Sequence, residues 1–595
     1  MSLFIKKYKY PNGKIYCSIV DGYRIDNKVK HRVIQKYGYF DNLENEFGDA
    51  DKYLNDELIR LKKENETKFT ITINKNLDND FNDDTFNIGY IYFKKIFQEL
   101  NIIDVLKNKQ HSSNIQYSLS KACELLTYSR IIDPGSIKHT YENKSQFFEP
   151  FDLSLDDLYR SLVPLLECKE NIFKTIWEST KDKYNRDAST SYYDCTNYYF
   201  EIEYDDEDIK DENGNIIKKG LRKRGPEKNH RPDPIVEMGL LLDKQGYPIS
   251  YNLFSGNTSE KETLVPEIQK IKRRHNIDKV IVVADRGLNC SDNMIKTAGI
   301  DLDKKNRDGY VYGQSIRGAD KEFKDWVLND NYIVDKIIDE DGTEIIFKHK
   351  SRIYPKKMYV TRDDKGLTKN GNKKRQSITV DQKQMVYYSQ KYADKQKRDR
   401  QMVIEKAKDL IKNPSAYTKA TSYGAAGYVN NIKFDKDTGV VADGLVLSLN
   451  EDKINEDAKY DGYYSIVTSE ENLTDLELRN IYKGLAKIEE TFKITKSEFN
   501  ARPINVRLED HIDAHFLICF ISLVIIRILQ NKTNEKYTLK NLLEKIKKFQ
   551  CTHETGNLYK FIGYKPEIQY LNRKLELNFD KKYDTRENIK KILKY

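Results

Sequence analysis

Three acidic residues, Asp194, Asp285 and Glu489, stand in sequence patterns that could bring them together for chemistry. Asp194 lies inside the aromatic, strand-like run SYYDCTNYYFEIE. Asp285 follows the apolar run KVIVVA, which is typical of a strand buried on both faces. Glu489 lies in a stretch with helical periodicity. Gathered carboxylates repel one another, and two Mg²⁺ or Mn²⁺ ions would relieve that repulsion and support in-line attack on a phosphodiester.

Residues 481–496 predict one amphipathic helix. At 100° per residue, one arc of its wheel holds Leu478, Tyr482, Leu485, Glu489, Phe492 and Lys496. Glu490 points about 100° away from Glu489, toward solvent. A carboxylate on an apolar face is costly to bury unless a cation meets it. The wheel alone leaves two interpretations open: a carboxylate at the rim of the apolar face, paired with lysine or arginine, or a metal ligand.

The elements around the two aspartates predict the order strand, strand, strand, helix, strand, with Asp194 on the first strand and Asp285 at the end of the fourth. Residues 293–298 predict a helix, and YVYGQS predicts a fifth strand. If the two aspartate strands are parallel neighbours, their acidic residues meet at one end of a sheet. The helix with Glu489 would then cross that end.

The changes of pattern along the chain predict six segments. These are a small basic β-rich domain (1–80), a helical DNA-binding or dimerisation domain (81–187), a first core segment (188–318), a β-rich insertion (319–460), a second core segment (461–530) and a helical basic C-terminal region (531–595). In the first segment, lysines interleave with tyrosines on short strands, and a helix (49–64) and one more strand (68–73) follow. That basic sheet fits a phosphate backbone and a solvated surface equally well.

The composition permits nucleic-acid binding without requiring it, because 102 lysines and arginines against 93 acidic residues leave a net charge of only +9 over 595 residues. The seven cysteines are scattered and form no CxxC pair, which argues against a disulfide framework and a cysteine zinc site. The N-terminus lacks an export signal, and the apolar run 516–526 suits a buried helix, not a membrane span. We therefore expect a cytoplasmic protein.

The motif residues Tyr482, Glu489 and Lys496, spaced by seven and seven, together with ADRGL after a buried strand, resemble bacterial insertion-sequence transposases of the DDE type. The IEETFK run, ARP (501–503) and AHFLICF (514–520) also fit, so the resemblance covers about residues 190–530. Within this family, the chain resembles the branch whose signature is Y-(2)-R-(3)-E-(6)-K. At the position of the signature's arginine this sequence has Leu485. Arg502 and Lys487 are candidates to replace that arginine.

This resemblance implies an α/β fold: an RNase H-like core, with a mixed sheet and flanking helices, interrupted by a mainly β insertion. It also implies that Asp194, Asp285 and Glu489 bind two Mg²⁺ or Mn²⁺ ions, and that Tyr482 and Lys496 hold transposon-end DNA. The function implied is cut-and-paste transposition by a homodimer on terminal inverted repeats and target DNA, in the bacterial cytoplasm at the nucleoid. Two alternatives stay open: a nuclease of the same fold without strand transfer, and a catalytically silent DNA-binding protein derived from a transposase.

Further residues are candidates for DNA contacts. They are Arg286, directly after Asp285, and the basic cluster Arg222, Lys223, Arg224, Lys228 and Arg231 in the loop after the Asp194 strand. Trp326 suits stacking on a flipped base, although packing within the insertion is favoured. His511 and His515 have a metal-like spacing, but without a third ligand they are better explained as helix-end polar residues.

Overall fold

The computed structural model describes residues 2–25, 28–66, 85–225, 232–275, 277–298, 307–339, 342–361, 366, 368, 373–419, 421–434, 440–442, 446–579 and 581–594. The chain divides into two compact units, residues 1–83 and 84–595. Each unit is described by itself. The strand expected at 68–73 lies outside the described residues.

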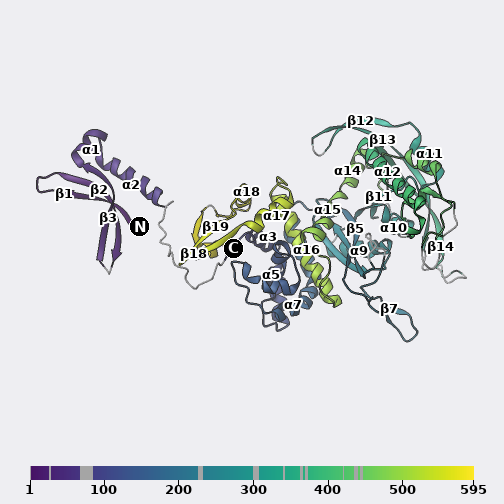
Figure 1. The fold of residues 1–595 in the computed structure, drawn as a ribbon, viewed down its shortest axis with the longest axis horizontal. Helices are drawn as coiled ribbons and strands as arrows, with labels where there is room; N and C mark the ends of the chain where they lie inside the picture. Colours follow the sequence, from purple (N-terminus) through teal and green to yellow (C-terminus); the bar gives the residue numbers. More distant parts are fainter. Residues whose placement is uncertain are drawn as a thin grey trace. The chain divides into compact units, whose positions relative to one another are not determined.

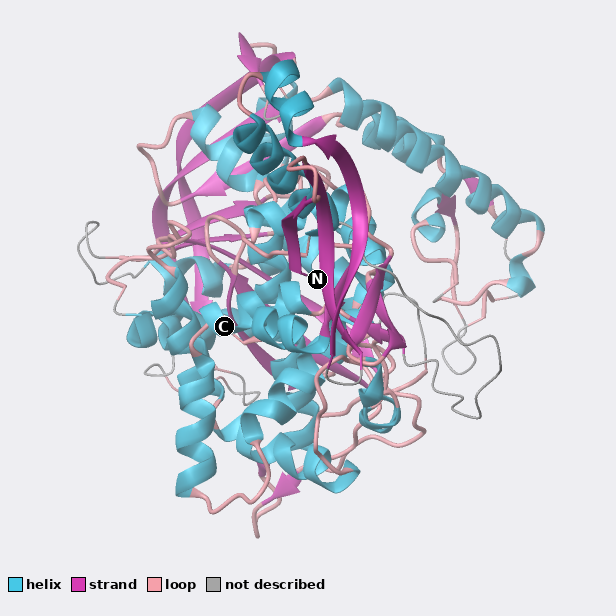
Figure 2. Ribbon diagram, turned by 90° about the vertical axis from the view of Figure 1, so that its left-hand side faces the viewer, coloured by secondary structure: helices cyan, strands magenta, loops and turns pink. Residues whose placement is uncertain are grey.

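The first unit is an antiparallel sheet with helices on one face (Figures 1 and 2). Its elements are β1 (Ser2–Lys9), β2 (Ile15–Ile25), β3 (Lys28–Tyr39), α1 (Phe40–Phe47) and α2 (Ala50–Glu66). Alternate strand residues such as Ile5, Cys17 and Ile19 pack against Leu43, Leu54 and Leu61 of the helices. The expected β-meander and charged helix are therefore present, and α1 joins them.

The second unit is built partly around α16 (Glu509–Lys532), a helix of 24 residues of which 17 are buried. Figure 1 shows α3 (Ile91–Glu99), α5 (Leu119–Ile132), α7 (Leu155–Glu167) and α17 (Leu539–Lys548) beside it in one lobe. The helices α4 (Ile102–Ser112), α6 (Ile137–Glu142) and α8 (Lys169–Thr180) pack in the same cluster. Side chains from these helices and from the strands beyond them form one hydrophobic cluster. The expected helical segment and the end of the chain thus share one core.

α16 contains the apolar run that the sequence assigns to a buried helix. Among the described helices it is long and apolar enough to cross a membrane, but 94% of its most apolar window is buried inside the protein. Its neighbours in the lobe cover the apolar residues that lipid would otherwise have to meet. α16 is therefore the central helix of a packed core, as expected.

The C-terminal region is not purely helical, contrary to expectation. Strands β18 (Gln550–Thr555), β19 (Leu558–Ile562) and β20 (Tyr583–Thr585) alternate with α18 (Pro566–Lys574) and α19 (Arg586–Leu593). These strands form an antiparallel sheet that is completed by β4 (Thr85–Asn87) from the start of this unit. Since β4 lies about 460 residues earlier in the chain, local sequence periodicity could not reveal this pairing.

A large mixed sheet forms the other part of the second unit, with strands in the order β12-β13-β14-β17-β11-β10-β5-β8-β9. Its first-half elements are β5 (Thr190–Tyr199), β8 (Ile235–Leu242), β9 (Pro248–Ser255), α9 (Glu260–His275), β10 (Ile281–Ala284), α10 (Ser291–Ala298) and β11 (Gly309–Gly313). β5, β10 and β11 are parallel neighbours, whereas β8 and β9 continue the sheet antiparallel to β5. The expected succession of three strands, a helix and a fourth strand is present.

The insertion is not a separate β subdomain, because its long strands extend this same sheet. β13 (Glu344–Thr361) pairs with β12 (Ile333–Ile338) and β14 (Arg375–Tyr388), and β14 pairs with β17 (Tyr463–Thr468), which pairs with β11. The insertion also contains helices, namely α11 (Lys321–Leu328), the 23-residue α12 (Gln390–Lys412) and α13 (Glu451–Ala458). A short hairpin, β15–β16 (Val429–Asn430, Ser448–Leu449), lies in a loop of the insertion. Another, β6–β7 (Ile209–Lys210, Ile216–Lys218), lies in the loop after β5.

His515 on α16 makes the stability of this core depend on pH. Burial, with the charge of Arg130 adding to it, lowers the pKa of His515 from 6.5 to about 3. Between these two values the unfolded chain binds a proton that the folded chain does not, so stability falls as the pH falls. The contribution is complete above pH 6.5 and is lost progressively below it, at about 1.4 kcal/mol per pH unit.

We predict that His515→Gln flattens the dependence of the unfolding free energy on pH between pH 6 and pH 4. Urea unfolding at several pH values measures this slope, and comparing slopes removes the constant packing cost of the substitution. Equal slopes for the variant and the wild type would contradict the assignment of a neutral buried imidazole.

Candidate active site

The pairing register of the parallel strands brings two of the three expected carboxylates together. Ile281 lies opposite Thr190 and Val283 opposite Tyr192, so continuing this register by two residues sets Asp285 beside Asp194. On the other side Ala284 lies opposite Tyr312, which sets Asp285 beside Gly313 at the end of β11. The two aspartates therefore meet at one edge of the sheet, as expected for parallel neighbours.

The helix that carries Glu489 is broken, contrary to the expected single helix over 481–496. α14 (Asp475–Lys483) ends before Gly484, α15 (Ala486–Lys493) follows, and residues Ile494–Glu498 form a π-helical turn. At the break the amides of Gly484 and Leu485 donate to carbonyls three residues back instead of four. A wheel at 100° per residue does not hold across such a junction.

Gly484 explains why the junction can lie so close to the sheet. A Cβ on this residue would lie 2.0 Å from the Tyr192 hydroxyl oxygen, so only glycine allows the helix to approach β5 at this point. The apolar face still holds, because Leu478, Leu485, Ile488 and Phe492 are buried. Glu489 itself is exposed at the edge of that face.

Asp194, Asp285 and Glu489 line the same cavity, which has a volume of about 820 Å³. Core strands supply the two aspartates, α14 and α15 supply one wall, and the insertion adds Ile345, Ile346 and Phe347 of β13 and the end of β14. The three carboxylates come from positions 91 and 204 residues apart in the sequence. The fold thus assembles them in one concave site, as the sequence predicts.

The surroundings of the carboxylates show how like charges are tolerated there. Asp194 Oδ1 accepts a hydrogen bond from the Cys195 amide at 2.8 Å, and Asp285 Oδ1 accepts one from the Gly287 amide at 2.6 Å. A Cβ on Gly287 would lie 3.1 Å from carboxylate oxygens of both Asp285 and Glu260, so α9 adds a fourth acidic group near the edge. Backbone donors therefore offset part of the repulsion.

The donor set fits a hard divalent cation. All three side chains are carboxylates on one cavity, and oxygen ligands of this kind suit Mg²⁺ or Mn²⁺. As they stand, no three His, Cys, Asp or Glu side chains among the described residues are close enough to hold a metal ion. Asp194 and Asp285 turn instead to backbone amides, and Glu489 reaches the cavity from a flexible, exposed side chain.

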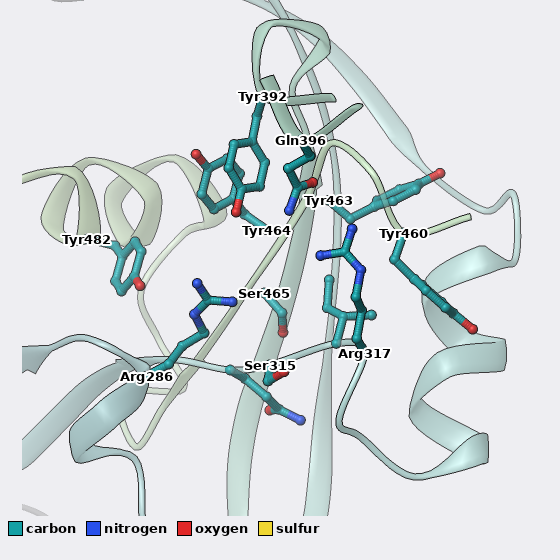
Figure 3. Close-up of a pocket in the computed structure, with 12 residues that line it drawn as sticks. Arg286, Ser315, Arg317, Tyr392, Gln396, Tyr460, Tyr463, Tyr464, Ser465 and Tyr482 are labelled. Carbon is teal, nitrogen blue, oxygen red and sulfur yellow. The ribbon is translucent and has the colours of Figure 1, made fainter. Parts of the chain in front are cut away.

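A second, smaller cavity of about 100 Å³ adjoins the first and shares Arg286, Tyr464 and Tyr482 with it (Figure 3). Burial raises the pKa of Tyr482, and the charge of Asp285 raises it further while Arg286 lowers it. Burial also raises the pKa of Tyr464 to about 12, with Arg286 and Glu489 acting in opposite directions. Both hydroxyls therefore stay protonated and able to donate hydrogen bonds beside the carboxylates.

Two cations of α14, Arg479 and Lys483, line the large cavity near Leu485. Arg479 lines the cavity and lies 3.5 Å from Asp339, which Lys483 also meets at 2.5 Å. Lys487 instead donates to the Lys244 carbonyl at the turn after β8, and Arg502 does not line the cavity. Neither expected replacement thus lines this cavity, whereas Arg479, one turn before Tyr482, does.

Lys496 lies against β5. Its ammonium donates to the Thr196 hydroxyl, two residues beyond Asp194, and stands 5.5 Å from the centre of the Tyr198 ring. The π-helical turn that carries Lys496 sets this position. Lys496 is thus beside the aspartate strand, although it does not line the large cavity.

Glu490 is exposed, as expected, and it is also paired with a cation. Its carboxylate lies 2.9 Å from the guanidinium of Arg527 on α16. This pair attaches α15 to the central helix. Glu489 and Glu490 therefore face different surroundings, as the wheel requires, but for Glu490 the partner is protein.

The basic cluster is largely neutralised by its own loop. Arg222, Lys223 and Arg224 pair with Asp206, Asp208 and Asp205 respectively. Lys228 and Arg231 lie outside the described residues. A DNA phosphate would therefore have to displace an aspartate in order to pair with any of the three described residues.

Trp326 and the two histidines are placed away from the carboxylates. Trp326 packs with Phe323, and the guanidinium of Arg352 stands 4.5 Å from its ring, so the packing interpretation is the one that the structure favours. His515 is buried beside Arg130 and Cys519. It forms no metal site with His511 among the described residues.

The sequence did not point to the residues that the insertion adds to the cavity. Besides Ile345, Ile346 and Phe347, they are Asp339, Tyr387, Tyr388, Ser389, Gln390 and Lys391. Arg479 was within reach of sequence reasoning, because a position three residues before Tyr482 shares its side of a helix, whereas Lys483, one residue after it, does not. The insertion residues were not, since only the pairing of β14 with β17 brings them to the site.

A comparison with protein families finds that residues 5–72 match the IS1634 family transposase, N-terminal domain. No curated protein is similar enough to the chain to count as a match. The matched residues belong to the first unit, whereas the carboxylates lie in the second. The match supports an insertion-sequence transposase, and such a family implies an enzyme that binds and processes DNA.

Gly313 provides a test of the site geometry. A Cβ there would lie 2.3 Å from the Tyr482 hydroxyl oxygen and 2.9 Å from Cγ of Arg286. We predict that Gly313→Ala lowers the unfolding free energy by about 1–3 kcal/mol through overpacking. Adding Tyr482→Phe removes the nearest atom and should recover at least half of the loss in urea unfolding.

Gly427→Ala is the matched control, because a Cβ at Gly427 meets nothing within 4 Å. If Gly313→Ala is no more destabilising than this control, the result would contradict a close contact between β11 and the Tyr482 side chain.

Proposed function

We propose that this chain is a DDE transposase that carries out cut-and-paste DNA transposition of its insertion sequence. It binds the terminal inverted repeats, hydrolyses phosphodiester bonds at the element's ends and joins the 3′-hydroxyls to target DNA. The observation that carries the proposal is the single cavity lined by Asp194, Asp285 and Glu489. The family match of the first unit supports it independently, because it concerns other residues.

In this proposal the three carboxylates hold two Mg²⁺ or Mn²⁺ ions. When bound, such ions activate an oxygen nucleophile and stabilise charge on the leaving oxygen. The same site can serve hydrolysis and strand transfer, since water and a 3′-hydroxyl are both oxygen nucleophiles that need in-line placement.

The chain's own residues would orient the DNA. Arg286 lies beside Asp285 and lines both cavities, so its guanidinium is placed to hold a phosphate near the carboxylates. The protonated Tyr482 hydroxyl can donate to the same backbone. Lys496 and Arg479 add positive charge on either side of the acidic edge, which lowers the repulsion between carboxylates and phosphate.

We further propose that strands β9-β8-β5-β10-β11 with α9 form an RNase H-like core. An aspartate on the first strand, another at the end of the fourth and a glutamate on a later helix support this assignment. The insertion then extends the sheet of that core and closes one wall of the site. The substrate is double-stranded DNA, the element's ends and a target, bound by a homodimer in the bacterial cytoplasm.

Substitution of the three carboxylates tests this function. We predict that Asp194→Asn, Asp285→Asn and Glu489→Gln each reduce Mg²⁺-dependent cleavage of element-end DNA by at least 100-fold, because each removes a charged ligand. End binding should stay within about threefold, since phosphate and base contacts lie elsewhere. Cleavage by gel assay and binding by fluorescence anisotropy separate the two effects.

Glu490→Gln is the matched control. It changes the same side chain in the same way one residue along α15, and weakens the pair with Arg527, whose guanidinium keeps its hydrogen bonds to Gln530, Lys487 and Thr491. Cleavage should therefore persist. Near wild-type activity in any of the three carboxylate variants, or a larger loss in Glu490→Gln than in Glu489→Gln, would refute the site.

A further inference from the structure

The N-terminal sheet has one face that its helices leave open. Leu3, Ile5, Cys17 and Ile19 face α1 and α2. Because strand side chains alternate, their neighbours occupy the other face. The register of the three strands arranges that open face in rows, which are Phe4, Val20 and Val33, then Lys6, Ser18 and Lys36, then Tyr8, Tyr16 and Tyr39.

The charge of this unit is strongly divided between the sheet and the helices. Residues 1–40 contain nine lysines and arginines against two aspartates. Residues 41–66 contain four lysines and arginines against nine acidic residues. A basic sheet backed by acidic helices presents a positive potential to one side only, which suits a polyanionic partner on the open face.

The aromatic residues of the open face are packed against one another. Tyr8 and Tyr10 make an edge contact at 4.9 Å, and Tyr16 and Tyr39 make another at 5.3 Å. In each edge contact one face of one ring is covered by its neighbour, so the rings do not form a flat stacking platform for unpaired bases. Their hydroxyls, and the exposed ammonium groups of Lys6 and Lys36, suit phosphate contacts instead.

The width of the face agrees with a duplex. The Cα atoms of Lys6 and Lys36 lie two strand spacings apart, about 10 Å. The major groove of B-form DNA is about 12 Å wide, so the two ammonium groups can reach phosphates on its two sides. Ser18 lies between the two lysines, and in the rows on either side Tyr8 is 56% exposed and Val33 48% exposed, so these side chains can reach toward the groove.

We propose that this open sheet face is a docking surface for double-stranded DNA, held by contacts to the phosphate backbone. The inference deepens the proposed function, since duplex DNA is the substrate there. It rests on residues of the first unit alone and does not depend on the carboxylate site.

The experiment measures binding of the full chain to a labelled 40-base-pair duplex of random sequence at several KCl concentrations, with EDTA present so that no cleavage occurs. We expect Lys6→Ala/Lys36→Ala to flatten the slope of log affinity against log salt by about two units, at roughly 0.9 per lost phosphate contact. Lys6→Arg/Lys36→Arg keeps the charge and should bind like the wild type.

The matched control is Lys52→Ala/Lys62→Ala, which removes the same charge from exposed positions of α2. It should change the slope by less than half a unit. An unchanged slope for the open-face variant, or equal changes in both, would overturn the proposal. Lys6→Gln/Lys36→Gln serves as a second open-face variant, and circular dichroism checks that each protein is folded.

A single strand of the same sequence distinguishes stacking from duplex docking. If the single strand binds more tightly than the duplex and loses most of its affinity in Tyr8→Ala/Tyr10→Ala, the surface is a single-strand platform and the proposal is wrong. If instead the duplex result holds while the carboxylate variants still cleave DNA, the docking surface stands and the proposed catalytic site fails.

Discussion

The pairing of β10 between β5 and β11 is the constraint on which the rest of the site depends. β10 is short, yet its register sets Asp285 beside Asp194 on one side and beside Gly313 on the other. Gly313 then admits Tyr482, and Gly484 admits the helix junction against Tyr192. A shift of one residue would turn Asp285 to the other face of the sheet and leave the cavity with a single aspartate.

Gathering acidic groups at this edge costs stability, and the chain offsets the cost locally. Backbone amides bond to Asp194 and Asp285, and Arg286 lies beside the pair. Asp339 of the insertion is held by Arg479 and Lys483 of α14, so the charge that the insertion adds to the cavity is compensated by the core helix. The result is a concave, partly neutralised acidic site, the kind of surface that divalent cations and phosphates complete.

Much of this arrangement could be read from the sequence. Three predictions depended on local patterns alone. They are the buried strand before Asp285, the aromatic strand around Asp194 and the helix around Glu489. The break at Gly484 could not be read, because it depends on Tyr192 of a distant strand. Two strand pairings could not be read either, because each joins distant parts of the chain. They are the pairing of β18 with β4 and that of β14, in the insertion, with β17. Arg479 could be predicted only in part. Its spacing to Tyr482 can be read from the sequence, but its pairing with Asp339 cannot.

The most direct test of the central claim is to map the cation site on the polypeptide. Fe²⁺ replaces Mg²⁺ at oxygen-ligand sites and, with ascorbate and peroxide, cleaves the backbone close to its ligands. The account predicts cuts near residues 194, 285 and 489 together, all suppressed by excess Mg²⁺ and all weakened by Asp285→Asn. Cuts confined to one of these segments, or cuts elsewhere that Mg²⁺ does not suppress, would contradict a shared metal site.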